Sequence, residues 1–401
     1  MTLSSGRAYL AIPGPSVIPD RVLQAMHRAA PNIYSGGLVD MVPGIVDDLK
    51  AVARTRHHAA IYIGNGHAAW EAAVANVFSR GDRALTLSTG RFAHGWTAIA
   101  RRMGVSVDIL EFGKRGPVDP ERVVEALAAD PAHEIKAVFC VQVDTSTSVR
   151  SDIAAIRAAM DQVGHPALLM VDCIACLASD RFEMDDWGVD VMVAACQKGL
   201  MTPPGLAFVF FNDRADAARE SADCVTEYWD WRPRTRPAYF SQFFDGTAPT
   251  HHLYGLRTAL DMINEEGLES VWARHAALAE AVWSACEAWG QAGPLELNIA
   301  ARGERSHAVT TLRIGAPRGT RLREWVEAHA GLTLGIGLGM EDPDDPGNDG
   351  YFRIGHMGHV NAHMVLGALG VIEAGLRATG TPYGAGALSA AADVIADRVG
   401  S

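Results

Sequence analysis

Short apolar runs and segments of helical periodicity alternate through the first two-thirds of the chain, and this alternation constrains the fold more than any other feature. The apolar runs include AAIYIGN, RALTLST, VSVDILEF, IKAVFCVQV, ALLMVDC, DVMVAACQ and LAFVFFN. Patterns typical of helices, such as AAWEAAVANVF, HGWTAIARRMG and SDIAAIRAAMDQVG, lie between them. Strands separated by helices predict an α/β fold with a mostly parallel sheet, whose strand C-terminal ends gather ligand-binding groups at one edge.

The pattern changes near Leu268. A long helical stretch, ESVWARHAALAEAVWSACEAWG, leads to apolar runs in HAVTTLRI, LTLGIG and YFRIGHMG, and the helical segment RLREWVEAHA separates the first two. The length of 401 residues also exceeds what one small domain accommodates. We therefore expect an N-terminal segment at 1–20, a large domain at 21–267 and a smaller C-terminal α/β domain at 268–401.

Charge and cysteine usage exclude several classes of protein. The formal net charge of -12 argues against nucleic acid as a partner, because phosphate backbones attract basic surfaces. No apolar run reaches the ~18 residues of a membrane-spanning helix, and the N-terminus lacks the apolar core of a signal peptide. The scattered cysteines lack the spacing of a disulfide framework, which favours a reducing cytoplasm. Cys173 and Cys176 form a CxxC pair, for which packing is a better explanation than metal binding. The acidic run 341–349 is expected to be a solvated loop.

Two chemically informative residues follow neighbouring apolar runs: Asp172 ends ALLMVD, and Lys198 follows VMVAACQ. A buried carboxylate one strand away from a lysine suits pyridoxal 5'-phosphate (PLP). The lysine amine forms a Schiff base with the cofactor aldehyde, and the carboxylate pairs with the pyridine nitrogen. Each residue also has an ordinary explanation, because aspartates are common at parallel-strand ends and most lysines there are solvated. The pair therefore indicates PLP only together with further motifs.

A candidate phosphate site is the turn Gly64-Asn65-Gly66-His67, between an apolar strand and a helical pattern that begins at Ala68. Backbone N–H groups at a helix start, exposed by small glycines, bind phosphate readily. A dinucleotide site is disfavoured because alanine stands at the third glycine of GxGxxG. An ordinary tight turn and a phosphate cradle are equally good explanations of this motif by itself.

Taken in order, the motifs resemble those of the class V, fold-type I PLP-dependent aminotransferases, especially the alanine–glyoxylate and serine–glyoxylate group. They run from IPGPSVIP through GNGHAAWE, DTSTSVRSDIAAI, VDCIACLAS, CQKGLMTPPGLA and TAPTHHLYGLRTAL to GLESVWARH and FRIGHMG, and cover nearly the whole chain. The resemblance implies a homodimer with shared active sites. It also implies transamination between a small amino acid of the alanine, serine or aspartate type and a 2-oxo acid such as glyoxylate or pyruvate.

The resemblance assigns roles around the cofactor ring. Lys198 matches the Schiff-base lysine, and Asp172 matches the partner of the pyridine nitrogen. Phe92 matches the aromatic residue that stacks on one face of the ring, and Ile174 the apolar residue on the other face. Thr145 matches a hydroxyl residue near the cofactor. Without the resemblance, Phe92 would more simply be a core residue.

Further matches concern the cofactor phosphate. Gly66 and His67 match contacts to the phosphate and the ring edge, with Asn65 at a position where a serine often occurs. Gln197 matches the residue beside the lysine that helps to hold the phosphate. Thr247 matches a phosphate ligand contributed by the second subunit, and this match is what implies the homodimer.

The expected substrate group is Arg353 in FRIGHMG, which matches the arginine that binds the substrate carboxylate through two parallel N–H bonds.

Some positions depart from the family pattern. Phe244 stands where many relatives have a tyrosine that reaches the neighbour's phosphate. The stretch 32–41 lacks the histidine–arginine pair common in serine–glyoxylate relatives, which leaves the amino donor open. The stretch 227–237, EYWDWRPRTRP, either lines the entrance or is a surface loop whose tryptophans pack on the domain.

Three alternative functions can be weighed against these motifs. A cysteine desulfurase needs a nucleophilic cysteine on a loop of the small domain, and no cysteine follows Cys286. A pyridoxamine–pyruvate transaminase, which takes free pyridoxal as substrate, is similar around SVWARHA, although GNGHAAWE retains the phosphate-site pattern. A non-catalytic PLP-fold binding protein would be expected to have lost the lysine or to carry a DNA-binding domain.

Overall fold

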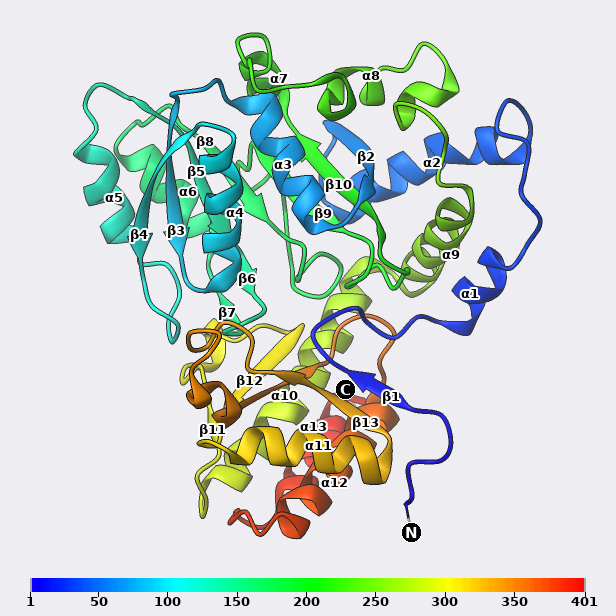
Figure 1. The fold of residues 1–401 in the computed structure, drawn as a ribbon, viewed down its shortest axis with the longest axis vertical. Coiled ribbons are helices and arrows are strands. Elements are labelled where there is room, and N and C mark those ends of the chain that lie inside the picture. The colour runs from blue at the N-terminus through cyan, green and yellow to red at the C-terminus, as the bar shows by residue number, and fades with distance from the viewer. Residues whose placement is uncertain (1, 400–401) are drawn as a thin grey trace.

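The computed structural model describes residues 2–399, which form two lobes with a sheet in each (Figure 1). The upper lobe of Figure 1 contains a seven-stranded sheet between layers of helices. The lower lobe contains a five-stranded sheet and the C-terminal helices. The predicted α/β architecture is thereby confirmed.

The seven-stranded sheet is mostly parallel. Its strands are β2 (His58–Gly64), β3 (Arg83–Ser88), β4 (Ser106–Glu111), β5 (Ile135–Val141), β8 (Leu168–Asp172), β9 (Val191–Ala195) and β10 (Gly205–Phe211). Their order across the sheet is β2-β10-β9-β8-β5-β3-β4. Only β10 runs against its neighbours, because a short loop joins it to β9 and leaves no room for the crossover that a parallel strand requires.

Helices cover both faces of this sheet, so each strand is buried on two sides. In β8, for example, Met170 belongs to the apolar cluster that includes α3 and α4, and Leu169 belongs to the opposite cluster with α2, α5, α6 and α9. The helices of this lobe are α1 (Asp20–Met26), α2 (Gly37–Val52), α3 (Gly66–Val77), α4 (Arg91–Arg102), α5 (Pro120–Ala128), α6 (Ile153–Gln162), α7 (Asp213–Ala218), α8 (Trp231–Thr235) and α9 (Thr250–Glu266).

The lower lobe is built from the C-terminal part of the chain together with one strand from the N-terminus. The order of its strands is β1 (Tyr9–Ala11), β13 (Leu332–Ile336), β14 (Tyr351–Gly355), β12 (Val309–Arg313) and β11 (Glu296–Leu297). Strand β1 is parallel to β13, and the other pairs are antiparallel. A separate apolar core forms with α10 (Leu268–Gly290), α11 (Arg318–Ala330), α12 (Ala362–Ala378) and α13 (Ala387–Val399).

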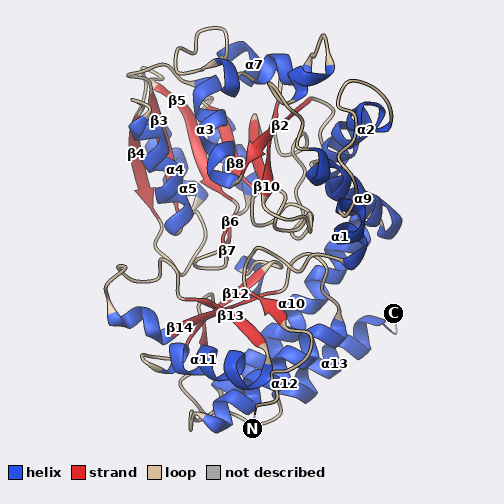
Figure 2. Ribbon diagram, turned by 45° about the vertical axis from the view of Figure 1, so that its right-hand side comes forward, coloured by secondary structure: helices blue, strands red, loops and turns tan. Residues whose placement is uncertain are grey.

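A small hairpin connects the two lobes. It consists of β6 (Val143–Asp144) and β7 (Val149–Arg150), which lie between the sheets in Figures 1 and 2. Thr311 Oγ1 donates to Ser146 O at 3.1 Å, and Asn298 Nδ2 donates to Thr147 O at 2.9 Å. Because Thr311 lies in β12 and Asn298 directly follows β11, both bonds hold the hairpin against the second sheet.

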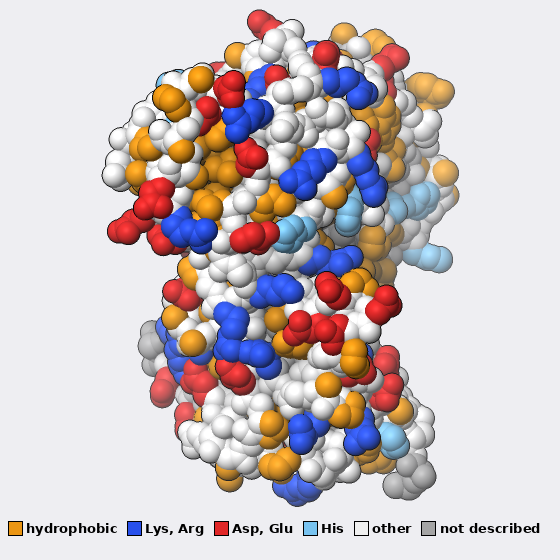
Figure 3. Space-filling model, turned by 60° about the vertical axis from the view of Figure 1, so that its left-hand side comes forward, with side chains coloured by type: hydrophobic (Ala, Val, Ile, Leu, Met, Phe, Trp, Pro, Cys, Tyr) orange, Lys and Arg blue, Asp and Glu red, His pale blue; other side chains and the backbone are white. Residues whose placement is uncertain are grey.

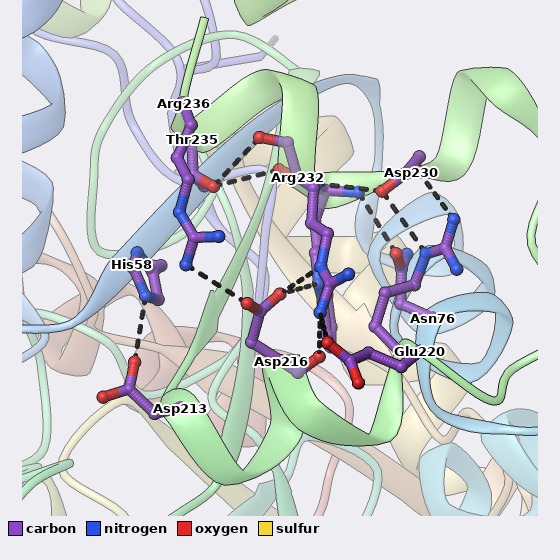
Figure 4. A network of polar contacts seen from close by, with 11 residues as sticks. His58, Asn76, Asp213, Asp216, Glu220, Asp230, Arg232, Thr235 and Arg236 are labelled. Atoms are coloured by element: carbon purple, nitrogen blue, oxygen red, sulfur yellow. Dashed lines mark hydrogen bonds and ion pairs between the residues drawn. The ribbon is translucent and has the colours of Figure 1, made fainter.

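The aromatic and basic stretch 227–237 packs on the upper lobe, which agrees with the second of its two predicted explanations. Trp231 is fully buried and stacks on Phe211 with ring centroids 4.0 Å apart. Arg232 and Arg236 both contact the carboxylate of Asp216 in α7 (Figure 4). Packing and ion pairs therefore account for this stretch.

The CxxC cysteines are also packed into the core. Cys173 and Cys176 are buried, and their thiols donate to Gln142 Oε1 at 3.4 and 3.0 Å. Burial is the main reason that the pKa of each thiol is raised, so both stay protonated at neutral pH.

The surface shows no dominant charge on the face drawn in Figure 3, where basic and acidic side chains are interspersed on both lobes. A narrower waist separates the lobes on this face. Across residues 2–399, no helix is both long and apolar enough to cross a membrane.

Candidate active site

A cavity of about 250 Å³ opens at the edge of the seven-stranded sheet where β2, β5, β8 and β9 end. All predicted cofactor-binding residues except Thr247 line it. The lining consists of Gly14, Pro15, Asn65, Gly66, His67, Trp70, Phe92, Val141, Val143, Thr145, Asp172, Ile174, Ala175, Gln197, Lys198 and Pro204. The loops after parallel strands therefore gather these side chains at one place, as the fold predicts.

Lys198 lies in the turn after β9, and the N-terminal segment covers it. Its Nζ donates to Pro13 O, and Ser16 Oγ donates to Lys198 O at 2.7 Å. A Cβ on Gly14 would lie 2.4 Å from the Lys198 side chain, and the φ of 92° at this position favours glycine. Burial, and then the charge of Arg353, lower the pKa of Lys198 to about 8. The amine is therefore much closer to its neutral, nucleophilic form at physiological pH than an exposed lysine would be.

Asp172 is the last residue of β8, and its buried carboxylate accepts two N–H bonds. Ile174 N donates to Oδ1 at 2.6 Å, and Trp70 Nε1 donates to Oδ2 at 2.8 Å. Burial raises the pKa of Asp172 to about 7, while these two bonds act in the opposite direction. A cation that entered the cavity beside Asp172 would therefore stabilise the ionised carboxylate.

The start of α3 forms one end of the cavity. Asn65 caps the helix, and its side chain accepts from His67 N at 3.0 Å. The helix begins at Gly66, two residues earlier than predicted, because the Asn65 cap allows the first turn to include Gly66 and His67. A Cβ on Gly66 would lie 2.5 Å from Ile174 Cδ1, so a larger residue at the helix start would displace the Ile174 side chain.

Phe92 and Thr145 line the side of the cavity next to the hairpin. Phe92 lies in the first turn of α4, and its N–H donates to Asp144 Oδ2 at 2.8 Å. Asp144 is fully buried, and its Oδ1 accepts from Ser146 N at 2.9 Å. This one carboxylate thus fixes α4 and the hairpin relative to each other.

Arg353 lies in β14 of the lower lobe and reaches across to the hairpin. Its Nε donates to Ile336 O at 2.6 Å, and its Nη1 donates to Thr145 O at 2.8 Å. Arg353 is 6% exposed and does not itself line the cavity, although Thr145 does. Burial lowers the pKa of Arg353 to about 10, which leaves the guanidinium charged at neutral pH. Its remaining N–H groups are available to an anion.

Three predicted features lie outside the cavity. Thr247 is exposed on the loop before α9. Phe244 is buried in its own chain, with ring contacts to Phe240 and Phe243. Tyr34, in the stretch 32–41, is 86% exposed. The structure of this single chain therefore leaves Thr247 and Tyr34 free for contacts that the chain itself does not make.

The sequence motifs did not identify Trp70 as part of the site. It lies in α3, lines the cavity and contacts Asp172. The motif GNGHAAWE contains Trp70, but the partner of its indole N–H is 102 residues away in the sequence, so spacing could not reveal the contact. Gly14 and Pro15 belong to the motif IPGPSVIP and form a wall of the cavity, and their contact with Lys198 is again a long-range one that spacing does not reveal.

The charges and orphaned polar groups of the cavity fit PLP. Among the described residues, Lys198 and Asp172 form no ion pair, although burial shifts the pKa of each toward its neutral form. Gln197 also lines the cavity, and its Oε1 is buried with no hydrogen-bond partner in the part of the chain that the structure describes. An aldehyde would satisfy the amine and a protonated ring nitrogen would satisfy the carboxylate, while the N–H groups at the start of α3 and the amide N–H groups of Gln197 would donate to a phosphate.

Comparisons with known proteins agree on one family. The family model described as "Aminotransferase class-V" matches residues 8–314. A serine–glyoxylate aminotransferase of Methylorubrum extorquens is 36% identical over 398 residues, which cover 98% of this chain and 96% of that protein. An L-aspartate–glyoxylate aminotransferase of Paracoccus denitrificans is 34% identical over 386 residues, covering 95% of this chain and 94% of that protein. The crystal structure of pyridoxamine–pyruvate aminotransferase from Mesorhizobium loti matches with a TM-score of 0.87 at 25% identity, over 98% of both chains.

Proposed function

This chain belongs to the class V aminotransferases, PLP-dependent enzymes of fold type I, and from that premise we propose that it transfers an amino group between a small amino acid and glyoxylate or pyruvate. The named glyoxylate aminotransferases that cover nearly the whole chain support this choice of substrates. The observation that carries the proposal is that two chemically suitable groups line one cavity and a third is bonded to its wall. Lys198 and Asp172 line one cavity, and Arg353 is bonded to its wall.

Each of these groups has a distinct task. When bound, PLP supplies an aldehyde that carries the amino group and a ring that accepts electrons. Arg353 binds the substrate carboxylate and so presents the α-carbon to Lys198. The neutral Lys198 amine takes the proton from the substrate α-carbon and returns a proton on the way to the product. Asp172 holds the proton on the cofactor ring nitrogen through an ion pair.

One arginine and one lysine serve both half-reactions, because the amino acid and the oxo acid occupy the site in turn. Ping-pong kinetics are therefore expected. The test is a panel of alanine, serine and aspartate as donors against glyoxylate and pyruvate as acceptors, with Lys198→Ala as the inactive control. Parallel double-reciprocal lines for at least one pair support the proposal, and no turnover with any pair would reject it.

The second candidate is transamination of free pyridoxamine with pyruvate. The pyridoxamine–pyruvate aminotransferase structure favours it, since that structure matches 98% of this chain. The cradle formed by Asn65 and Gly66 favours a phosphorylated cofactor instead, because a helix start held this close to the cavity attracts an anion. Turnover of free pyridoxamine with pyruvate, by protein that contains no tightly bound PLP, would support the second candidate.

We also propose that the enzyme is a homodimer with shared active sites. The exposed position of Thr247, outside the cavity of its own chain, supports a contribution to the partner's phosphate site. The six free cysteines support a reducing compartment, for which we propose the cytoplasm. We further propose a division of the chain into an N-terminal segment at 1–20, a large domain at 21–267 and a small domain at 268–401. The two separate cores, and Gly267 with φ 82° between α9 and α10, support that division.

A further inference from the structure

Trp70 has an unusual position for a buried tryptophan, because its only polar atom points at the carboxylate of the active site. The side chain is 1% exposed, and Nε1–H donates to Asp172 Oδ2 at 2.8 Å. Its ring contacts His67 with centroids 4.6 Å apart and Phe92 with centroids 6.2 Å apart. The indole therefore lies between the carboxylate and two side chains that line the same cavity.

The two hydrogen-bond donors to Asp172 affect the protonation state and the orientation of its carboxylate. Ile174 N–H occupies Oδ1 and the indole N–H occupies Oδ2, and neither donor can accept a proton in return. A proton on Asp172 therefore has to point away from both donors. When the carboxylate is ionised, both bonds become charge-assisted and stronger. The arrangement thus favours the ionised form and fixes the plane of the carboxylate.

We propose that Trp70 is a positioning residue, which stabilises the ionised form of the Asp172 carboxylate and orients it toward the ring nitrogen of the cofactor. The proposal rests on the proposed function for the identity of the ring, but the effect of Trp70 on Asp172 is a property of this chain alone.

Other groups also act on Asp172. Asp144 raises its pKa through like-charge repulsion, and Lys198 lowers it. The charge of Asp172 acts in turn on the thiols of Cys140, Cys173 and Cys176, whose pKa values burial raises so far that they stay neutral near pH 7. Trp70 differs from all of these groups because it does not titrate, so it acts on Asp172 at every pH.

The chain contains a matched control in Trp96. This residue is fully buried, and its ring stacks against Trp70 at 6.3 Å and 12°. Its Nε1 has no hydrogen-bond partner among residues 2–399. Trp70→Phe and Trp96→Phe therefore each replace one indole of the same aromatic stack by a phenyl ring, but only Trp70→Phe also removes a hydrogen bond.

The first experiment uses the native full-length chain with ¹⁵N-labelled tryptophan, followed by NMR from pH 5 to pH 9 with and without PLP. Without PLP, we expect the Trp70 indole N–H resonance to follow the titration of Asp172 near pH 7, while the Trp96 resonance stays constant. With PLP bound, the Trp70 resonance should lose its pH dependence, because Asp172 is then ionised throughout. A Trp70 resonance that does not change with pH in the PLP-free chain would overturn the proposal.

The second experiment measures the dissociation constant of PLP near pH 7 for the two variants. The bond to an ionised partner is stronger than the bond to a neutral one, so we expect Trp70→Phe to raise the dissociation constant about ten-fold and the Asp172 titration midpoint by about one pH unit. Trp96→Phe should change neither by more than about two-fold or a few tenths of a pH unit. Equal effects of the two variants would assign Trp70 a packing role only. If native protein fails to bind PLP while the Trp70 resonance still follows Asp172, the proposed function is rejected and the effect of Trp70 on Asp172 stands.

Discussion

Replacing Arg353 by lysine tests how the site recognises both substrates. A guanidinium has five N–H groups, and Arg353 uses one on Ile336 O and one on Thr145 O. Three N–H groups are then left, which is enough for two parallel bonds to a carboxylate. A lysine ammonium has three N–H groups, so after bonding the same two carbonyls it retains one. Arg353→Lys therefore loses one charge-assisted bond, worth about 1.5–3 kcal/mol.

That loss corresponds to an increase of about ten-fold to a hundred-fold in KM. Because the same arginine serves both half-reactions, KM should increase for the amino acid and for the oxo acid alike in steady-state ping-pong kinetics. Arg323→Lys is the matched control, since Arg323 is a neighbouring arginine whose Nη2 donates to Thr320 Oγ1 rather than to the cavity wall. Unchanged KM values for both substrates in Arg353→Lys, or equal changes in the control, would refute the assignment.

Three further predictions follow from the same geometry. Because the pKa of Lys198 is about 8, its amine becomes neutral and nucleophilic as the pH rises through 8. The rate at which PLP-free protein captures PLP, followed by absorbance, should therefore rise with a midpoint near pH 8. A midpoint near the ordinary lysine value of 10.5 would contradict this prediction. Gly66→Ala places a Cβ 2.5 Å from Ile174 Cδ1 and should weaken PLP binding by about 1–3 kcal/mol. Adding Ile174→Val removes that methyl group and should restore part of the affinity in equilibrium titrations, whereas no recovery would place the clash elsewhere. A hybrid dimer of Thr247→Asp and Lys198→Ala chains, isolated through two different tags, should regain about half of the native activity per dimer, and an inactive hybrid would exclude sites shared between subunits.

The architecture of the upper lobe was predictable because its signals are local. Apolar runs such as 58–64 and 168–172 are long enough to identify buried strands, and the helices between them imply parallel pairing. Direction was harder to predict for β10, whose run LAFVFFN resembles those of its parallel neighbours. The nine residues between β9 and β10 carry the relevant information, since a connection this short joins antiparallel strands. Strand β1, with three residues, is too short for a periodic signal and forms only because β13 offers it an edge.

For the site residues too, local sequence signals were predictive and contacts between distant elements were not. Residues placed at strand ends, such as Asp172 and Lys198, were predictable because parallel strands bring their ends together. Contacts that depend on packing between distant elements were not predictable from spacing, and the bond from Trp70 to Asp172 is the clearest case. Arg353 shows a third situation, since its motif indicated the residue while its two backbone partners are visible only in the fold.

Borohydride reduction of the purified holoenzyme, followed by peptide mapping, tests whether Lys198 is the residue that binds PLP. The chain has four lysines, Lys50, Lys114, Lys136 and Lys198, so the assignment is unambiguous. Lys114 Nζ donates to Met340 O, and Lys136 Nζ pairs with Asp82, both away from the cavity. We expect a yellow protein in which the reduced PLP label is found on the peptide that contains Lys198. A label on any of the other three lysines would show that Lys198 is not the residue that binds PLP.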